Sequence, residues 1–268
     1  MPLSIPPATG PVKFEELKRM RTGIPGFDEL MTKGIPVGSS VLIEGGPGSG
    51  KTIFCLQVAY NACNAGLKVL YMSFEEAERR LIHHMDNFGW NPRKFIDKGN
   101  FIIRRFSALD VSRSVEALLS EAKKELLIDI KPMFFPRDFK PDIVLVDSLS
   151  SIASAFSGHS SRFRIYMEQL FKYLERENIT SFLIRETPTP SHLGRVTGRE
   201  EAVSFLADGI VVLYNILYPK RGERMGALEV IKMRGEKFLK KIVKMEIASG
   251  KGVVVYPSEE ISGDFILT

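Results

Sequence analysis

The chain has 268 residues, of which 44% are hydrophobic and 26% charged, a balance that excludes intrinsic disorder as the overall state. Lysine and arginine exceed aspartate and glutamate by 37 to 32, which fits a phosphate or nucleic-acid partner but also an ordinary charged surface. No apolar run approaches the roughly 18 residues of a membrane span, no signal peptide is recognisable, and two cysteines cannot build a disulfide framework. We therefore expect a cytoplasmic protein.

Strands and helices are expected to alternate along most of the chain. Residues 1–20 hold four prolines and are predicted to form an N-terminal arm, so the folded domain is expected to span 21–268. Short apolar segments typical of buried strands lie at 41–44, 69–74, 101–104, 143–146 and 179–184. Helical spacing is found at 51–65, 75–88, 111–130 and 163–174, and four further strands are expected at 210–213, 227–233, 242–247 and 253–256.

This order of elements predicts an α/β fold. Alternating strands and helices favour a mainly parallel central sheet with helices on both faces. The strands after Gly209 are joined by short turns, so they are expected to add an antiparallel C-terminal extension to that sheet.

The segment from Gly45 to Thr52 matches the phosphate-binding pattern G-x-x-x-x-G-K-[ST] and lies between an expected strand and an expected helix, as that pattern requires. Its glycines allow backbone N–H groups to turn toward phosphate oxygens, and the helix N-terminus adds partial positive charge. We expect Lys51 to reach the β- and γ-phosphates of ATP and the Thr52 hydroxyl to ligate Mg²⁺. The predicted nucleotide-binding residues are Gly46, Pro47, Gly48, Ser49, Gly50, Lys51, Thr52 and Ile53.

Acidic residues follow two other expected strands. Asp147 ends the apolar run at 143–146; such a residue alone is more often a turn or cap residue, but beside a phosphate motif a Mg²⁺ role is the better interpretation. Glu75 and Glu76 follow the run at 69–74, and a glutamate at that edge can orient a water against a γ-phosphate. Acidic residues are also common in the first turn of any helix, so both interpretations stay open here.

Seven segments occur in the order found in KaiC-type ATPases of the RecA superfamily, and the chain resembles this family from about Arg21 to Tyr256. Besides the phosphate motif they are GIPGFDEL (23–30), GIPVG (34–38), SFEE (73–76), VDSLS (146–150), ADG (207–209) and KMRG (232–235). The resemblance implies a RecA-type P-loop ATPase fold, present once, as in archaeal single-domain homologues.

The resemblance also implies roles for individual residues. Glu75 and Glu76 correspond to the paired catalytic carboxylates of the family, and Asp147 to its second magnesium residue. Lys232 and Arg234 correspond to the residues that reach the γ-phosphate bound by a neighbouring subunit. Strand alternation is expected to place both cations on the face that carries Leu228 and Val230. Without the resemblance, the two cations would be interpreted as surface charges at a strand end.

The chain departs from the circadian clock members of the family at several positions. Glu236 and Lys237 follow the KMRG segment, and Arg185 stands where a threonine is common. The phosphorylated serine–threonine pair of the clock protein falls near Ser204 and Phe205, so a two-site phosphorylation cycle is not expected. Autokinase activity stays open, with no acceptor residue that we can name.

The sequence thus predicts a Mg²⁺-dependent protein that binds and hydrolyses ATP to ADP as a homo-oligomeric ring, a hexamer by the resemblance, in signalling or regulation. One alternative is a slow ATP-binding switch or scaffold in a motor or signalling complex with a protein partner. Another is a DNA-binding recombinase or helicase relative. For that alternative the loop at 187–201, with Arg195 and Arg199, is a weak signal.

Overall fold

The computed structural model describes residues 18–121, 135–136, 138–156, 160–187, 199–219 and 222–267. The predicted arm lies outside the described residues except for its last three. The predicted helix beyond residue 121 and most of the loop at 187–201 also lie outside them. Within the described residues, no helix is long and apolar enough to cross a membrane.

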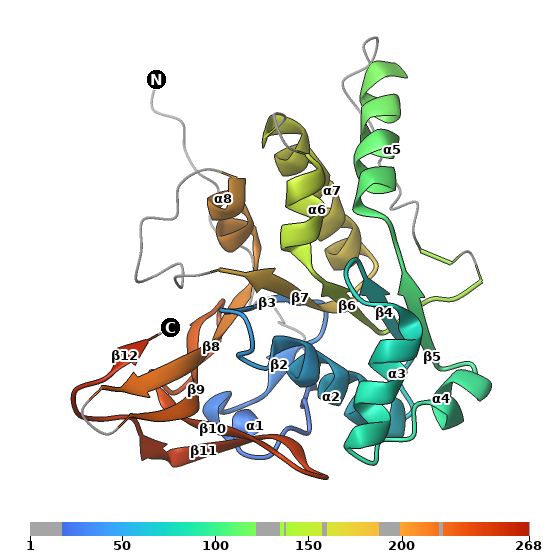
Figure 1. The fold of residues 1–268 in the computed structure, drawn as a ribbon. Helices are drawn as coiled ribbons and strands as arrows, with labels where there is room; N and C mark the ends of the chain where they lie inside the picture. The colour runs from blue at the N-terminus through green and yellow to red at the C-terminus, as the bar shows by residue number, and fades with distance from the viewer. Residues whose placement is uncertain are drawn as a thin grey trace, which may run out of the picture.

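A large central sheet organises the molecule, with the strand order β11-β10-β9-β8-β3-β7-β6-β4-β5 and β12 paired to β8 (Figure 1). The strands from β8 to β5 in this order are parallel, and β9, β10 and β11 continue antiparallel from β8. This confirms the predicted fold class. The parallel strands are β3 (Ser40–Gly45), β4 (Val69–Ser73), β5 (Phe101–Arg105), β6 (Ile143–Asp147), β7 (Thr180–Glu186) and β8 (Gly209–Tyr218). The others are β9 (Glu223–Met233), β10 (Val243–Ala248), β11 (Gly252–Glu260), β12 (Ile266–Leu267) and a separate pair, β1 (Arg19–Met20) and β2 (Ile35–Pro36).

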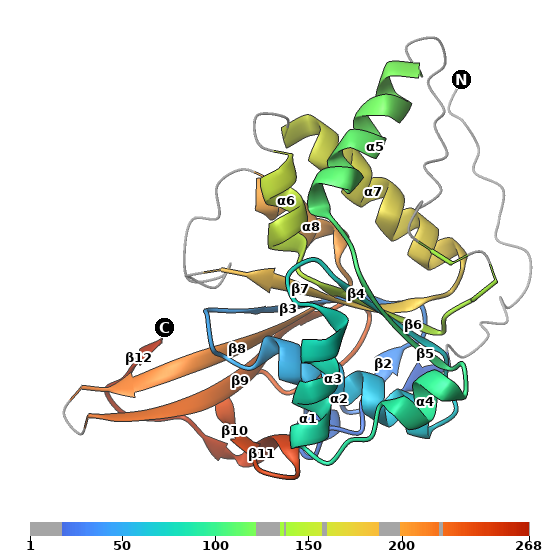
Figure 2. The same ribbon diagram turned by 45° about the vertical axis from the view of Figure 1, so that its right-hand side comes forward.

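Helices cover both faces of this sheet, as Figures 1 and 2 show. One face carries α1 (Phe27–Leu30), α2 (Lys51–Asn64), α3 (Glu78–Asn87) and α4 (Arg93–Asp97). The other carries α5 (Ala108–Glu121), α6 (Leu149–Ala155), α7 (Ser160–Arg176) and α8 (Arg199–Leu206). Successive strand residues alternate between the two cores: Val41 and Ile43 pack on the first face and Leu42 on the second. Burial on both faces explains why the parallel strands are continuous apolar runs.

Two helices differ from the sequence-based expectation. The helix predicted from Glu75 begins at Glu78, because the Ser73 hydroxyl accepts a hydrogen bond from Glu76 N (3.0 Å) and donates one to Glu76 O (2.7 Å). These bonds hold Glu75 and Glu76 in a bend outside the helix. The short helix α6 was not predicted. It begins after Ser148, whose side chain accepts a hydrogen bond from Ser151 N as an N-cap does.

The prediction that Lys232 lies on the same face of its strand as Leu228 and Val230 is wrong. Leu228, Val230 and Met233 all belong to the core on the α2 face, so the alternation shifts by one residue between Val230 and Met233. The cause is a bulge: Val211 pairs with Val230 but Ile210 pairs with Lys232, which leaves an extra residue on β9. The Lys232 ammonium therefore meets the carbonyls at the end of α8, on the opposite face from Leu228.

Candidate functional site

The carboxyl ends of four neighbouring parallel strands meet at one edge of the sheet. Gly45 of β3 is paired with Glu186 of β7, and Ser73 of β4 with Asp147 of β6. The phosphate motif follows β3 directly and leads into α2. This edge therefore brings the predicted phosphate-binding loop close to Asp147 and to the bend that carries Glu75 and Glu76, which is where ligands bind in open α/β sheets.

The phosphate loop has the backbone that an anion cradle needs. Gly45, Gly48 and Gly50 have φ values of 153°, 72° and 97°, a region that favours glycine. A Cβ at Gly45 would lie 2.3 Å from Leu213 O, whereas a Cβ at Gly48 would meet nothing within 4 Å. Among the described residues, the buried Ser49 Oγ has no hydrogen-bond partner. A buried polar atom without a partner beside a glycine-rich turn fits a loop that is completed by a phosphate.

Lys51 is held inside this loop by its own chain. Its Nζ donates to Gly46 O at 2.8 Å and lies 3.9 Å from Glu186 Oε1, and the residue is only 6% exposed. Burial lowers the pKa of Lys51, and the nearby carboxylates of Glu186, Asp147 and Glu75 oppose that shift. An anionic ligand would stabilise this buried ammonium much more than one carbonyl and one distant carboxylate do.

Thr52 and Asp147 are in direct contact. Asp147 Oδ2 accepts hydrogen bonds from Thr52 Oγ1 (2.9 Å) and from Tyr71 Oη (2.7 Å). Burial raises the pKa of Asp147 to about 6 against the opposing effect of these two donors, and the charges of Glu75 and Glu76 raise it further. A hydroxyl and a carboxylate side by side fit Mg²⁺, which is usually bound by one or two protein oxygens plus substrate phosphates. No group of three histidine, cysteine or acidic side chains suited to a metal occurs in the described residues.

The adjacent Glu75 and Glu76 have different partners. Glu75 Oε1 accepts hydrogen bonds from the hydroxyls of Ser148 and Ser151, the latter at 2.8 Å. Glu76 Oε2 lies 3.0 Å from His84 Nε2 on α3. Glu75 is thus directed toward α6 and Glu76 toward α3, so the two adjacent glutamates have different surroundings.

Lys232 and Arg234 are not brought to this edge. The Lys232 Nζ donates to the carbonyls of Ser204 (2.9 Å) and Ala207 at the end of α8. Burial, and then the charge of Arg234, lower the pKa of Lys232. Arg234 donates to Phe205 O and lies 3.4 Å from Asp208 Oδ1. Cations at a helix C-terminus are favourable by themselves, so these contacts stabilise the isolated chain.

Sequence reasoning gave no role to His84, Ser148 or Ser151, the residues that hold the two glutamates. A hydroxyl directly after a buried strand and before an apolar i, i+3 pair is an N-cap pattern, and it could have revealed Ser148. No sequence pattern connects His84 with Glu76, eight residues earlier.

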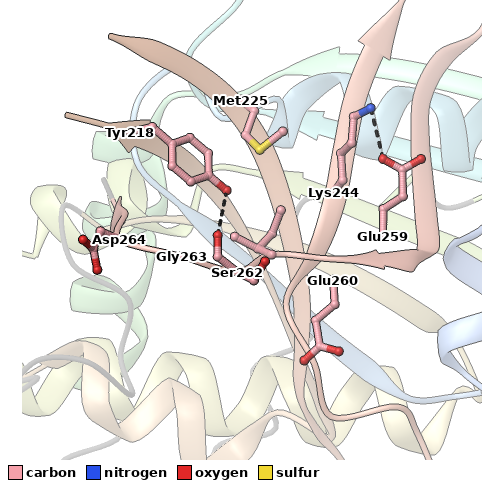
Figure 3. A pocket seen from close by; sticks show the side chains of 9 residues that line it. Tyr218, Met225, Lys244, Glu259, Glu260, Ser262, Gly263 and Asp264 are labelled. Atoms are coloured by element: carbon pink, nitrogen blue, oxygen red, sulfur yellow. Dashed lines mark hydrogen bonds and ion pairs between the residues drawn. The ribbon is translucent and has the colours of Figure 1, made fainter. Parts of the chain in front are cut away.

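A cavity of about 400 Å³ lies elsewhere, in the antiparallel extension (Figure 3). Its lining includes Tyr218, whose hydroxyl is 3.5 Å from Ser262 O, and Lys244, whose Nζ is 3.2 Å from Glu259 Oε2. Hydrogen bonds from Lys244 to Glu246 and Glu259 raise the pKa of Lys244. The cavity shares no residue with the phosphate loop, so we assign it no part in the site.

A model of the KaiC ATPase family matches residues 20–260. The chain belongs to this family. Membership supports ATP binding and ATPase activity in general, and it agrees with the phosphate loop and with the acidic residues at the carboxyl edge.

Similar proteins include both single-domain and longer members. A UPF0273 protein of Thermotoga maritima is 32% identical over 251 residues, which cover 91% of this chain and 98% of that protein. The circadian clock oscillator protein KaiC of Synechococcus elongatus is 27% identical, and the match covers 91% of this chain but 45% of that protein. A crystal structure of a KaiC-like protein from Pyrococcus horikoshii has a TM-score of 0.70 and 28% identity, covering 90% of this chain and 100% of that one.

Proposed function

We propose that this KaiC family member hydrolyses ATP with Mg²⁺ at sites shared between neighbouring chains of a homo-oligomeric ring, a hexamer by its resemblance to the family. The observation that supports this most strongly is a separation. The phosphate loop, Asp147 and Glu75 lie where the parallel strands end, which we call the carboxyl edge of the sheet. Lys232 and Arg234 lie where the parallel strands begin, which we call its amino edge.

The register of the strands gives the scale of this separation. Met233 pairs with Gly209 of β8, and Gly209 pairs with Val41 near the start of β3. The phosphate loop begins after Gly45, four residues further along β3, or about 13 Å at 3.3 Å per residue. Two interstrand spacings of about 4.8 Å add to this distance, so Arg234 cannot reach a phosphate held by its own loop. A second copy of the chain could supply the cations.

The surface around Arg234 supports contact with such a copy. The side chain of Arg234 is 56% exposed, and the adjacent Phe205 is 68% exposed. An exposed aromatic residue beside an arginine is the composition typical of the centre of a protein interface. The same face carries the carbonyls that Lys232 and Arg234 contact in the isolated chain.

In the proposed reaction each residue positions or neutralises a group. Lys51 holds the β- and γ-phosphates, and the free Oε2 of Glu75 accepts a hydrogen bond from the attacking water and aligns it. Lys232 and Arg234 of the neighbouring chain stabilise the charge that develops on the transferred phosphoryl group. Thr52 and Asp147 would hold Mg²⁺, which would supply positive charge against the phosphates. The signalling or regulatory role proposed for this turnover rests on the family resemblance alone.

The test is complementation between two inactive variants. Glu75→Gln chains lack the water-orienting carboxylate and Arg234→Ala chains lack the cation in trans, so each homo-oligomer should be inactive. In co-expressed mixtures some interfaces combine an intact Glu75 with an intact Arg234, and those sites should hydrolyse ATP. We expect ATPase activity well above that of either variant alone, measured as phosphate release.

Two outcomes would contradict the shared site: mixtures that are shown to co-assemble yet stay inactive, or full wild-type activity in a protein shown to be monomeric. Wild-type turnover measured in the same assay also separates an ATPase from a slow ATP-binding switch.

A further inference from the structure

We propose that Ser151 is a positioning residue for Glu75, which it holds in the orientation that leaves one carboxylate oxygen free for water. This inference rests on the proposed function, because it presumes that Glu75 orients the attacking water. It concerns the first turn of α6, an element that has no other assigned part in the reaction.

Glu75 needs support from outside its own segment. It lies in the bend between β4 and α3, where no helical hydrogen bonds order the backbone, and it is exposed. A glutamate side chain has three rotatable bonds, and holding it in one rotamer costs conformational entropy. A base that must align a water molecule therefore needs a second contact that selects one rotamer.

The two serines provide that contact on one oxygen. Ser148 Oγ and Ser151 Oγ both donate to Glu75 Oε1, the latter at 2.8 Å, and no hydrogen bond to Oε2 is recorded among the described residues. Two donors that converge on Oε1 fix the direction of the carboxylate plane. Oε2 is then the oxygen that can accept a hydrogen bond from water.

Ser151 can be changed with less damage to the fold than Ser148. Ser148 is fully buried and its hydroxyl also caps α6 by accepting from Ser151 N at 3.3 Å. The Ser151 hydroxyl has no capping role; besides Glu75 it lies 3.4 Å from Ser148 Oγ. Loss of the Ser151 hydroxyl therefore tests the contact with Glu75 with little effect on the start of the helix.

The first turn of α6 is a rigid base for this contact. Ser150 Oγ accepts from Glu186 N at 3.0 Å and donates to Glu186 O at 3.3 Å, which ties the helix to the end of β7. Because α6 is joined to β6 through Ser148 and to β7 through Ser150, its position follows the sheet edge that also carries the phosphate loop. Positioning groups on rigid elements maintain catalytic geometry better than groups on loops do.

The experiment compares Ser151→Thr with Ser151→Val in the full chain. The two side chains have nearly the same shape, and only threonine keeps the hydroxyl. We expect Ser151→Val to lower kcat about tenfold, the rate equivalent of one hydrogen bond to a charged group, with KM and Mg-ATP affinity unchanged. Ser151→Thr should retain most of the wild-type kcat. Ser154→Ala is the control, because the Ser154 hydroxyl donates to Ser150 O at 2.9 Å on the same helix and does not contact Glu75.

A double-mutant cycle shows whether the effect acts through Glu75. In a Glu75→Gln background, Ser151→Val should change the residual rate less than about twofold, since contacting residues do not act additively. An unchanged kcat in Ser151→Val, an equal loss in Ser151→Thr or Ser154→Ala, or a full tenfold loss in the Glu75→Gln background would overturn the proposal. If Glu75→Gln alone keeps wild-type turnover, the base assigned under the proposed function is wrong instead.

Discussion

The two edges of the sheet hold their charged residues in opposite ways. At the carboxyl edge Lys51 and Asp147 are 6% and 4% exposed. Burial lowers the pKa of Lys51 and raises that of Asp147, which favours the neutral form of each. At the amino edge the Arg234 side chain is 56% exposed, and it contacts the carbonyl of Phe205 and the carboxylate of Asp208. A buried charge with few partners is stabilised when a ligand of opposite charge binds, whereas an exposed cation with partners gains little from a further ligand.

This contrast indicates which half of the proposed site a single chain can complete. The carboxyl edge offers the proposed ligands a buried ammonium, a buried carboxylate and, among the described residues, an unpartnered hydroxyl, that of Ser49. At the amino edge Lys232 and Arg234 already have oxygen partners in the described part of the chain, although the nearby buried Ser204 Oγ has none, so the part that we propose for these cations in hydrolysis depends on a neighbouring chain.

Arg234→Ala should have the largest effect on turnover. An arginine supplied across an interface can contribute about 10³–10⁵-fold to phosphoryl transfer, because it neutralises charge that develops only in the transition state. We expect kcat to fall by at least about 10³-fold, which is the lower limit of that range, while most nucleotide affinity remains. Arg224→Ala, an exposed arginine at the other end of β9, is the matched control and should behave as wild type. An Arg234→Ala protein with normal kcat would remove the amino edge from the mechanism.

Glu75→Gln and Glu76→Gln should differ strongly. Loss of a positioned base costs about 10²–10⁴-fold in rate, and we expect that loss for Glu75, whose Oε2 is available to water. Glu76 Oε2 lies within hydrogen-bonding distance of His84 Nε2 (3.0 Å), so we expect Glu76→Gln to retain most activity. The measurement is the rate of single-turnover ATP hydrolysis. Both variants should bind ATP with equal affinity. The reverse ranking would identify Glu76 as the base.

Lys51→Ala should weaken ATP binding without affecting assembly. A charge-assisted contact contributes about 3 kcal/mol at most, which corresponds to an affinity loss of roughly 100-fold, and no other described cation lies within the loop. Isothermal titration with Mg-ATP gives the dissociation constant. Lys98→Ala, an exposed lysine after α4, is the control. Unchanged affinity in Lys51→Ala would show that the loop does not bind the phosphates.

The sequence predicted the carboxyl edge well, because its chemistry depends on local patterns. The phosphate motif is one continuous segment, and Asp147 ends an apolar run that is typical of a buried strand. The GIPGFDEL segment is predictable for a different reason: a Cβ at Gly26 would lie 1.9 Å from Val255 O, so the motif preserves a close backbone approach. Such constraints remain visible in sequence because few residue types satisfy them.

The amino edge and the partners of the glutamates could not be predicted in the same way. The direction of Lys232 depends on a bulge opposite Ile210 and Val211, which arises from pairing with β8 and not from the β9 sequence. The contacts of Glu75 with α6 and of Glu76 with His84 are tertiary contacts, and neither follows from a periodicity. The helix α6 itself, Leu149–Ala155, is too short for helical spacing to be recognised.

The smallest energy change among these predictions is expected for Asp147→Asn, which should stabilise the nucleotide-free protein. Burial disfavours the charged form of Asp147 and raises its pKa from the ordinary value of 3.8 to about 6 in the folded chain. A carboxyl with a raised folded pKa binds protons more tightly when folded, so its contribution to stability falls as pH rises from about 4 through 6. At pH 7.5 the ionised form costs at most about 3 kcal/mol of unfolding free energy, from 1.36 kcal/mol per pKa unit.

Asparagine removes this cost and keeps an oxygen that can accept from Thr52 and Tyr71. Urea unfolding should therefore show Asp147→Asn to be about 1–3 kcal/mol more stable than wild type at pH 7.5, with the gain shrinking as pH falls toward 4. The control is Asp97→Asn, at an exposed position, which should leave the unfolding free energy at pH 7.5 unchanged. Mg-ATP at 1,000 times the dissociation constant should reverse the order, because ligand binding stabilises only the chain that can hold it, by about 4.1 kcal/mol. A destabilised Asp147→Asn protein at pH 7.5 without nucleotide would mean that the buried carboxylate is already well paired, and that the carboxyl edge is complete without a cation.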